Sequence, residues 1–380
     1  TLGDETLNPL EIWTAESQEQ CTFLTKAKYV DLIKYIASRE KINLEFIGIV
    51  TTDSKIRVYD KNNNKIPLLV DLPLDEVLES IPSKYYIFDS LENLKKAEYF
   101  THDHELFKNN VDSTLCMLNI GSKRFLTNKV DRSVTGLVAQ QQCIGPFQTP
   151  ISNYTILAHS YFNNTGTVSA IGEQPLKGLL SIENMVKLTI SELLTNIMWV
   201  YIEEGLKSIK CSGNCMWSIT KDSEKWKITN AVDILCENLL SLGVSIDGGK
   251  DSLSMQVNSN NKTVICPGTL VLTGYAAINN INCKITPELK VSGNLLYLIK
   301  LDNQFSLGGS NYSYVKGKFS QGYCPEVDIH KLENLFKCIQ KFIKKDLIYS
   351  GHDISDGGLI TTLAEMSISS LFGIDIKINN

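Results

Sequence analysis

Apolar residues in the middle of the chain recur with the period of a helix. Between residues 182 and 202 they are spaced three and four apart, which predicts a long helix that is buried or half-buried. A second stripe over residues 231–242 predicts another helix, and Gly243 follows it as the expected C-terminal stop. Both helices belong to one informative block, which runs from about residue 114 to residue 287.

The first 70 residues predict a unit of strand, helix, strand and strand. The helix is expected over residues 29–39, with Leu32, Ile33 and Ile36 facing inward. The three strands are expected at residues 21–25, 44–51 and 55–59. Three consecutive asparagines at residues 62–64 are typical of a hairpin turn.

Prolines interrupt the pattern after this unit. Pro67, Pro73 and Pro82 break up the next stretch, so residues 71–112 are interpreted as a partly helical, charge-rich linker. Beyond it, short apolar runs predict strands at residues 115–120, 125–128, 244–246, 253–257, 295–300 and 347–349, and a helix at residues 359–369.

Composition places the chain among ordinary globular proteins. Of its 380 residues 43% are hydrophobic and 21% are charged, which argues against intrinsic disorder and fibrous repeats. The net charge is −5 and the basic residues are scattered, so we expect neither a nucleic acid nor a membrane as partner. Apolar runs fall far short of the roughly 20 residues that cross a bilayer. The ten cysteines are dispersed, which favours reduced thiols and a cytoplasmic location.

Two glycine-containing segments could bind phosphate. Residues 351–358 place two carboxylates, a hydroxyl, a histidine and paired glycines between a predicted strand and a helix. This composition suits Mg²⁺ bound to phosphate, because Mg²⁺ prefers oxygen ligands and glycine lets backbone N–H groups approach an anion. The ordinary alternative is that Asp356 caps the helix and the glycines make a turn. Residues 248–252 form a similar glycine turn with one lysine, which suits either a phosphate or a plain hairpin and lacks P-loop spacing.

Glu192 and Asn196 lie one turn apart on the predicted central helix, which is otherwise apolar. Burying such groups without partners is costly, so they either face solvent or bind something. A metal ion is one candidate. The other is a pair satisfied by backbone groups or by Arg132.

Five motifs occur in order along the chain: DRSVTGLVAQQQCIGPFQTP at 131–150, GE at 172–173, SELLTN at 191–196, GKDSLSM at 249–255 and HDISDGGL at 352–359. Together they resemble the phosphoribosylformylglycinamidine synthase family, whose members are large glutamine-dependent enzymes of purine biosynthesis. PLEIW at 9–13 and ESQE at 16–19 match an upstream part of the family, so the resemblance covers nearly the whole chain.

The resemblance implies an α/β (α+β) fold built from AIR-synthase-like, or PurM-like, domains. Residues 1–70 resemble the end of a first C-terminal-type domain, and residues 71–112 the linker that follows. Residues 113–288 resemble the second N-terminal-type domain, which binds nucleotide, and residues 291–380 the start of its C-terminal-type partner. We therefore expect the chain to be the middle of a larger synthetase.

The family reaction converts the amide of formylglycinamide ribonucleotide (FGAR) to the amidine of formylglycinamidine ribonucleotide (FGAM). ATP phosphorylates the amide oxygen, and ammonia released from glutamine by a glutaminase domain displaces the phosphate. Phosphoryl transfer needs Mg²⁺ to neutralise charge and a rigid cradle to align the oxygens. The resemblance thus implies a ligase that uses Mg²⁺ and ATP or ADP, with FGAR, ammonia and the glutaminase as partners through the rest of the parent chain.

The resemblance also implies individual site residues. Metal ligands are expected at Asn153, Glu192, Asn196 and Asp353, and nucleotide contacts at Lys123, Ser152 and Ser355. The family has an aspartate where this chain has Asn153, which removes a negative charge and should weaken Mg²⁺ binding. Gln174 likewise stands where the family usually has arginine.

The catalytic residues remain unknown from this sequence. In the family, this second nucleotide site is auxiliary and structural, and catalysis occurs at a related site in another part of the enzyme. The isolated chain is therefore not expected to turn over substrate. The alternative is a pseudoenzyme or scaffold that keeps the fold with a degraded nucleotide site, for which Asn153 is the main evidence.

Overall fold

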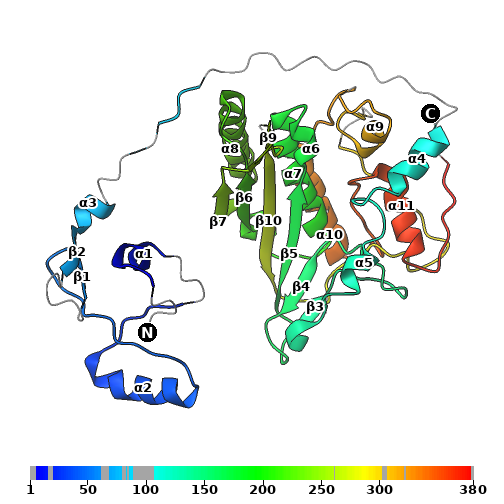
Figure 1. Ribbon diagram of the computed structural model, residues 1–380. Helices are drawn as coiled ribbons and strands as arrows, with labels where there is room; N and C mark the ends of the chain where they lie inside the picture. The colour runs from blue at the N-terminus through cyan, green and yellow to red at the C-terminus, as the bar shows by residue number, and fades with distance from the viewer. Residues whose placement is uncertain are drawn as a thin grey trace. The chain divides into compact units, whose positions relative to one another are not determined.

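The chain forms two compact units, residues 1–85 and 86–380, and each is considered by itself (Figure 1). The computed structural model describes residues 6–15, 20–60, 68–78, 83, 85–88, 107–260, 262–301, 306–320 and 322–377. None of the helices in these ranges is both long and apolar enough to span a bilayer.

The described part of the first unit contains short helices and a hairpin. Its elements are α1 (Pro9–Thr14), a 3-10 turn (Ala27–Tyr29), α2 (Val30–Arg39), β1 (Lys55–Tyr59), β2 (Leu68–Pro73) and α3 (Leu74–Leu78). The backbone N–H of Asn8 donates to the Glu11 carboxylate and the N–H of Glu11 donates to Asn8 Oδ1, a reciprocal cap that starts α1. Strands β1 and β2 pair antiparallel.

The structure confirms the helix and the strand at 55–59 in this unit and contradicts two other strands. Residues 21–25 and 44–51 have no regular structure. Leu32 and Ile36, which were expected to face inward, are 54% and 40% exposed. Strand formation requires a neighbouring strand to bond the backbone, and the described part of this unit provides only the β1–β2 pair. The predicted turn at 62–64 lies outside the described residues.

A six-stranded mixed sheet forms the centre of the second unit, in the order β3-β4-β5-β10-β6-β7. Its strands are β3 (Val138–Gln140), β4 (Thr155–Ala158), β5 (Gly166–Glu173), β6 (Lys210–Met216), β7 (Ser245–Ser252) and β10 (Thr269–Ile278). Neighbours pair antiparallel except β6 and β7, which are parallel and are joined through a helix. Strands β8 (Gln256–Ser259) and β9 (Lys262–Ile265) make a separate hairpin.

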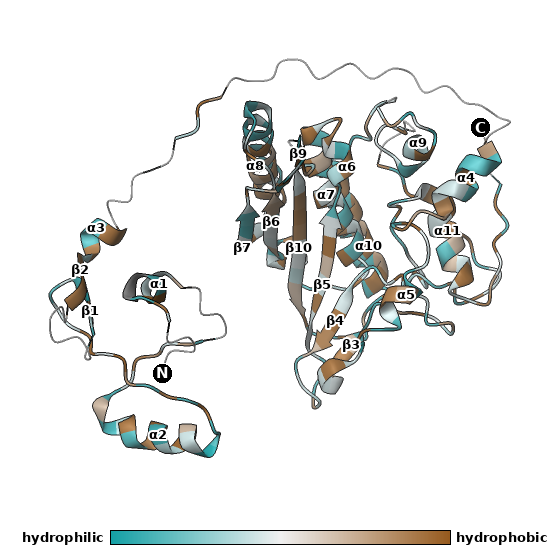
Figure 2. Cartoon of the chain, in the orientation of Figure 1, coloured by the Kyte–Doolittle hydropathy of each residue, from teal (hydrophilic) through white to brown (hydrophobic). Residues whose placement is uncertain are grey.

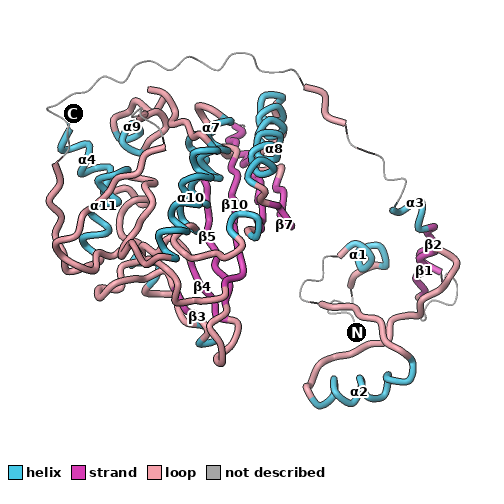
Figure 3. Tube along the Cα trace, turned by 180° about the vertical axis from the view of Figure 1, so that it is seen from behind, coloured by secondary structure: helices cyan, strands magenta, loops and turns pink. Residues whose placement is uncertain are grey.

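Three long helices lie against this sheet, as the view from behind shows (Figure 3). They are α7 (Ile182–Ile197), α8 (Asp222–Leu242) and α10 (Ile329–Lys344), of which α7 contacts β5, β10 and both other helices. Buried apolar residues of β5, β10 and these three helices form the core, and brown segments in Figure 2 mark apolar positions along both strands. Gly172 allows close approach, because a Cβ there would lie only 2.2 Å from the Thr189 carbonyl oxygen.

The remaining helices of the second unit are short. They are α4 (Phe107–Leu115), α5 (Arg124–Thr127), 3-10 turns at Val134–Gly136 and Gly205–Ser208, α6 (Pro175–Gly178), α9 (Asn311–Val315) and α11 (Gly358–Ile368). Gln340 joins α10 to the segment after α7 through three hydrogen bonds. Its side chain accepts one from Ile202 N and donates to the carbonyl oxygens of Met198 and Val200. This buried amide fixes the part that follows residue 291 against the sheet domain.

The helical predictions hold better than the strand predictions in this unit. α8 ends at Leu242 and Gly243 adopts the left-handed conformation with φ 69°, as expected, while α7 ends at Ile197 rather than at 202. The strand predictions for residues 115–120 and 125–128 are wrong. Residues 115–120 end α4 and continue in turns, and residues 125–128 lie in α5 and the turn that follows it. Residues 295–300 and 347–349 also form no strand. The predicted glycine turn at 248–252 is wrong too, because β7 continues through it.

Candidate functional site

Glu192 lies on α7 where this helix meets the end of β5. Its Oε2 accepts hydrogen bonds from Glu173 N at 2.7 Å and from Gln174 Nε2 at 3.0 Å. Burial, together with the charges of Asp353 and Glu173, raises the pKa of Glu192 to about 7, against the opposite effect of these two hydrogen bonds. The carboxylate is therefore held where added positive charge would be favourable.

Asn196 lies one turn further along α7 and donates from Nδ2 to the Ile171 carbonyl oxygen at 3.2 Å. Glu192 and Asn196 thus both bond the backbone of the β5 region, as the ordinary alternative expected, whereas Arg132 is not their partner. Each backbone contact uses one polar atom of the side chain. These contacts hold both side chains at the end of β5, and they leave Glu192 Oε1 and Asn196 Oδ1 for a ligand.

Asp353 is 8% exposed and follows the segment that bridges to Thr286 through Ser350. Thr362 Oγ1 of α11 donates to the Asp353 carbonyl oxygen at 3.0 Å. His352 Nδ1 lies 3.1 Å from Asp353 Oδ1, and His352 Nε2 lies 2.9 Å from Glu365 Oε2. Burial lowers the pKa of His352, but the two carboxylates outweigh it and raise the pKa to about 9. The histidine is therefore a cation between two carboxylates at neutral pH.

Asp356 does not cap α11, contrary to the ordinary alternative. The N-cap is Gly357 with φ 85°, and no side chain caps the helix. Asp356 instead accepts a hydrogen bond from Asn119 Nδ2 at 2.7 Å and lies 4.0 Å from Lys177 Nζ. Burial, then the charge of Asp356, raises the pKa of Glu173, so these acidic groups share one region.

Lys123 lies near the same loop. Its Nζ donates to the Gly121 carbonyl oxygen at 2.5 Å. Burial lowers the pKa of Lys123, and the charges of Glu365 and Asp356 act in the opposite direction. A lysine whose charge interacts with Asp356 of the loop and Glu365 of α11 is well placed to meet a phosphate.

Asn153, Ser152 and Ser355 are less closely linked to the rest. Asn153 is 8% exposed, and neither its Nδ2 nor its Oδ1 has a hydrogen-bond partner among the described residues. Ser152 Oγ donates to the Tyr154 carbonyl oxygen at 2.8 Å, and Ser355 is exposed in the loop before α11. An unpaired buried amide is costly, which points to a ligand at Asn153.

The structure brings Glu192, Asn196 and Asp353 to one region and shows no direct contact between them and Asn153. Within the described ranges, no three His, Cys, Asp or Glu side chains are grouped to hold a metal ion. The expected ligand set has only two carboxylates, and Mg²⁺ is often held by one or two carboxylates together with substrate phosphates. The oxygen donors present therefore fit Mg²⁺ when a nucleotide accompanies it.

Sequence reasoning missed four residues of this region: Asn119, Lys177, Thr362 and Glu365. For the last two a signal existed, since a threonine and a glutamate three residues apart share one helix face directly after the HDISDGGL motif. For Asn119 and Lys177 no local pattern was informative, because their partners are distant in sequence.

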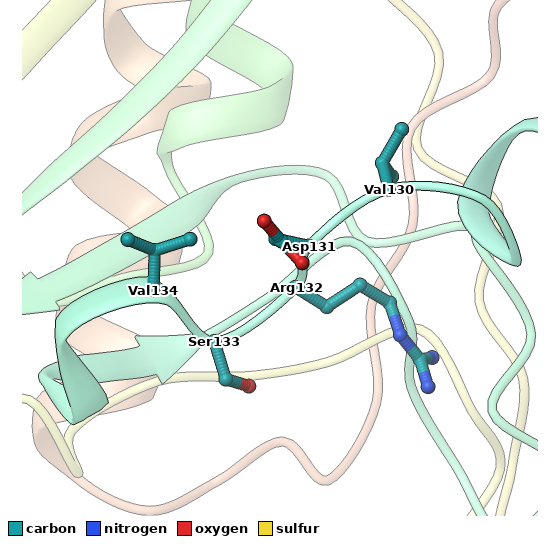
Figure 4. A pocket seen from close by; sticks show the side chains of 5 residues that line it. All are labelled: Val130, Asp131, Arg132, Ser133 and Val134. Carbon is teal, nitrogen blue, oxygen red and sulfur yellow. The ribbon is translucent and has the colours of Figure 1, made fainter.

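A hollow of ≈ 360 Å³ is lined by residues 130–134 (Figure 4). The side chains of Asp131, Arg132 and Ser133 point in different directions there and do not converge on one point. This hollow is therefore a poor candidate for a site.

Comparisons of fold and domains define the class of protein. Residues 122–277 match the FGAR-AT PurM_N-like domain, and residues 291–380 match the C-terminal domain of AIR synthase related proteins. The fold is similar to "T. maritima PurL complexed with ATP", with a TM-score of 0.60 and 14% identity over 97% of this chain and 51% of that chain. The TM-score with a crystal structure of phosphoribosylformylglycinamidine synthase II from Thermotoga maritima is 0.53, with 14% identity over 96% of this chain and 50% of that chain. The chain is thus a PurM-like protein of mixed α/β fold.

Curated relatives identify the family within this class. The chain is 41% identical to phosphoribosylformylglycinamidine synthase of Dictyostelium discoideum over 99% of its own length and 28% of that protein. It is 36% identical to the enzymes of that name from Homo sapiens and Drosophila melanogaster, over 99% and 100% of this chain and 29% of each. The chain belongs to the phosphoribosylformylglycinamidine synthase family, and it spans 28–29% of the length of these relatives.

Proposed function

We propose that the chain is part of an ATP- and glutamine-dependent ligase that converts FGAR to FGAM in purine biosynthesis. The names of the curated relatives support this reaction, and the fold it shares with a protein crystallised with ATP supports a nucleotide as ligand. Within this ligase the chain contributes an auxiliary Mg²⁺–nucleotide site.

One observation carries the proposal of the site. Glu192 comes from the part that matches the PurM_N-like domain and Asp353 from the part that matches the C-terminal domain, yet their charges interact. His352 supplies positive charge beside Asp353, whereas the pKa of Glu192 stays raised, so a further positive charge is favourable there. A cation-bridged phosphate at the junction of the two domain types explains this arrangement.

The roles of the side chains follow from their chemistry. Glu192, Asp353, Asn196 and Asn153 offer oxygens to Mg²⁺, and Lys123, Ser152 and Ser355 offer N–H or O–H donors to the phosphates. Bound Mg²⁺ neutralises phosphate charge. The unpaired amide of Asn153 supports its place in this set, since a ligand would satisfy its buried atoms.

The remaining assignments are part of the same proposal. Residues 1–70 would complete a first C-terminal-type domain, 71–112 a linker, 113–288 the nucleotide-binding domain and 291–380 its partner domain. FGAR, ammonia and the glutaminase would meet the chain through other parts of the parent enzyme in the cytoplasm. Catalytic groups would lie elsewhere in that enzyme, so this chain alone would not turn over substrate.

Asn153 also favours a second candidate, a pseudoenzyme or scaffold that retains only the fold. An asparagine in place of a carboxylate reduces the attraction of the site for Mg²⁺. On this alternative Glu192 and Asn196 would serve only to bond the backbone of β5.

Calorimetric titration of the 380-residue chain with Mg·ADP distinguishes the two candidates. The ligase proposal predicts clear binding, strong loss in Glu192→Gln and no change in Glu183→Gln, a matched control whose carboxylate pairs with Lys187 at the surface of the same helix. Asn153→Asp should bind more tightly, because it adds a negative charge at a position proposed to face the cation. Absence of binding in both the unaltered chain and Asn153→Asp would favour the scaffold.

Turnover provides a separate test. The chain supplied with ATP, FGAR and ammonia should release no more phosphate than a buffer control. Sustained phosphate release would show that catalytic groups lie within these 380 residues and would contradict an auxiliary role.

A further inference from the structure

A histidine enclosed between two carboxylates lies directly beside the proposed cation site. His352 Nδ1 lies 3.1 Å from Asp353 Oδ1, an ion-pair distance without hydrogen-bond alignment, and its Nε2 makes a 2.9 Å hydrogen bond with Glu365 Oε2. The side chain of His352 is 7% exposed and that of Glu365 is 31% exposed. The imidazole is therefore confined, and Glu365 is the group that holds it on the side away from Asp353.

One face of α11 supplies the contacts that restrain Asp353. Thr362 and Glu365 are three residues apart on α11, so they project from neighbouring positions on one face. Thr362 Oγ1 donates to the Asp353 carbonyl oxygen, which restrains the backbone. Glu365 engages the ring of His352, which in turn contacts the Asp353 carboxylate. The backbone and the side chain of Asp353 are thus restrained from the same helix.

The orientation of Asp353 matters for a cation because the contact with His352 uses only Oδ1. Oδ2 is then the oxygen left for a ligand. A carboxylate fixed before binding loses less conformational freedom when the cation arrives, and groups behind a ligand commonly determine its affinity. Removing Glu365 would let the imidazole turn and would free the Asp353 carboxylate.

We propose that Glu365 is a positioning residue for the Mg²⁺–nucleotide site: it holds His352, and His352 orients Asp353 toward the cation. The inference rests on the proposed function, since it requires Asp353 to bind the metal. Glu365 does not touch the cation itself, and it lies outside the HDISDGGL motif.

Titration with Mn²⁺ in the presence of ADP, followed by electron paramagnetic resonance of free Mn²⁺, measures the effect on the whole chain. Glu365→Ala should weaken Mn²⁺ binding about 10-fold or more. Glu365→Gln keeps an acceptor for the ring and should lose less. Glu333→Gln on α10 is the matched control, because Glu333 pairs with Lys337 at the surface, and its affinity should not change.

If Glu365 had a merely structural role, other measured quantities would change. That role predicts that Glu365→Ala lowers the thermal midpoint of the ligand-free chain and the metal-free affinity for ADP along with the affinity for Mn²⁺. The positioning role predicts that only the Mn²⁺ affinity falls. Normal Mn²⁺ binding by Glu365→Ala would overturn the positioning role alone, whereas no Mn²⁺ binding by the unaltered chain would overturn the proposed function and this inference with it.

Selective ¹⁵N labelling of histidine tests the contact without any metal. The ring signals of His352, assigned with His352→Gln, should shift in both Glu365→Ala and Asp353→Ala, because each variant removes one of the two ring contacts. Unchanged His352 signals in Glu365→Ala would overturn the positioning role whatever the Mn²⁺ titration shows.

Discussion

Residues 248–252 and residues 351–358 are similar in composition, but the structure uses them in different ways. Both contain paired glycines close to an aspartate and a serine. The first segment continues β7 and pairs in parallel with β6 throughout. The second leaves its strand-like bridge at Ser350 and turns into the N-terminus of α11. A neighbouring strand, and not the glycines, decides whether such a segment becomes sheet or loop.

The glycines of the two segments serve different needs. Gly249 lies opposite Gly213, and a Cβ on it would be 2.2 Å from the Gly213 carbonyl oxygen, so the residue allows two strands to approach. Gly357 has φ 85°, which a residue with a side chain rarely adopts, so it allows the turn into α11. Only the second segment presents a carboxylate to Glu192.

The largest expected effect compares Asp353 in the second segment with Lys250 in the first. Asp353→Asn should weaken Mg·ADP binding about 100-fold, because it removes one of two carboxylates in the cation site. Lys250→Ala should change it by no more than about twofold, since Lys250 is exposed and donates only to Ser252 nearby. Calorimetry measures both. Equal losses in the two variants would mean that both segments bind nucleotide.

Next in size is the effect of adding a methyl group within β7. Gly249→Ala should destabilise the chain by about 2 kcal/mol, because the new Cβ would collide with backbone of β6. Gly248→Ala is the matched control: nothing lies within 4 Å of its Cβ position, so its stability should stay close to that of the unaltered chain. Urea unfolding measures the difference. Similar midpoints for the two variants would contradict the close approach of these strands.

A smaller effect comes from pH. Burial raises the pKa of Glu192 to about 7, and the carboxylate must lose its proton to bind Mg²⁺. Mg·ADP affinity should therefore rise about 10-fold between pH 6 and pH 8, with proton release on binding. Since the pKa is raised in the folded chain, the ligand-free chain should lose stability as pH rises through 7.

Calorimetry in buffers of different ionisation enthalpy counts the released protons. Metal-free ADP titrations over the same pH range remove the contribution of the nucleotide itself. A flat affinity between pH 6 and pH 8 would contradict a direct role of the Glu192 carboxylate.

The smallest expected effect compares the serines. Ser355→Ala should weaken Mg·ADP binding about threefold, because Ser355 is exposed and water can replace its hydrogen bond to the phosphate. Ser252→Ala should leave the affinity unchanged, because Ser252 lies in β7 and bonds Lys250. The same titrations compare the affinities of these two variants. A larger loss of affinity in Ser252→Ala would indicate that the phosphate binds at residues 248–252.

Sequence periodicity identified α7 and the second half of α8, but α10 was not predicted and most of the strand predictions were wrong. The apolar stripe of α8 and the left-handed Gly243 are local features, so they could be recognised in the sequence. Residues 295–300 carry a strand-like pattern but are not paired, and Tyr297 is 80% exposed. A strand depends on a partner, and the sequence of one segment does not contain that information.

The same limit applied to the site. Motif order was enough to name Glu192 and Asp353 as candidates, but not to show what holds them. Glu365 lies beyond the motif, and its contact with His352 could be recognised only from the folded chain. The alternative that Asp356 caps α11 was wrong, because Gly357 is the N-cap residue and the Asp356 carboxylate accepts a hydrogen bond from Asn119.

Local pattern and motif identity were thus enough for the helices α7 and α8, for the family and for the residues that could bind a cation. Three-dimensional pairing was needed to show that β7 extends through its glycines and that Glu192 and Asp353 share one region. The physical reason is that helix periodicity arises among near neighbours in the chain. Strand pairing and electrostatic coupling join residues far apart in sequence, so they exist only once the chain has folded.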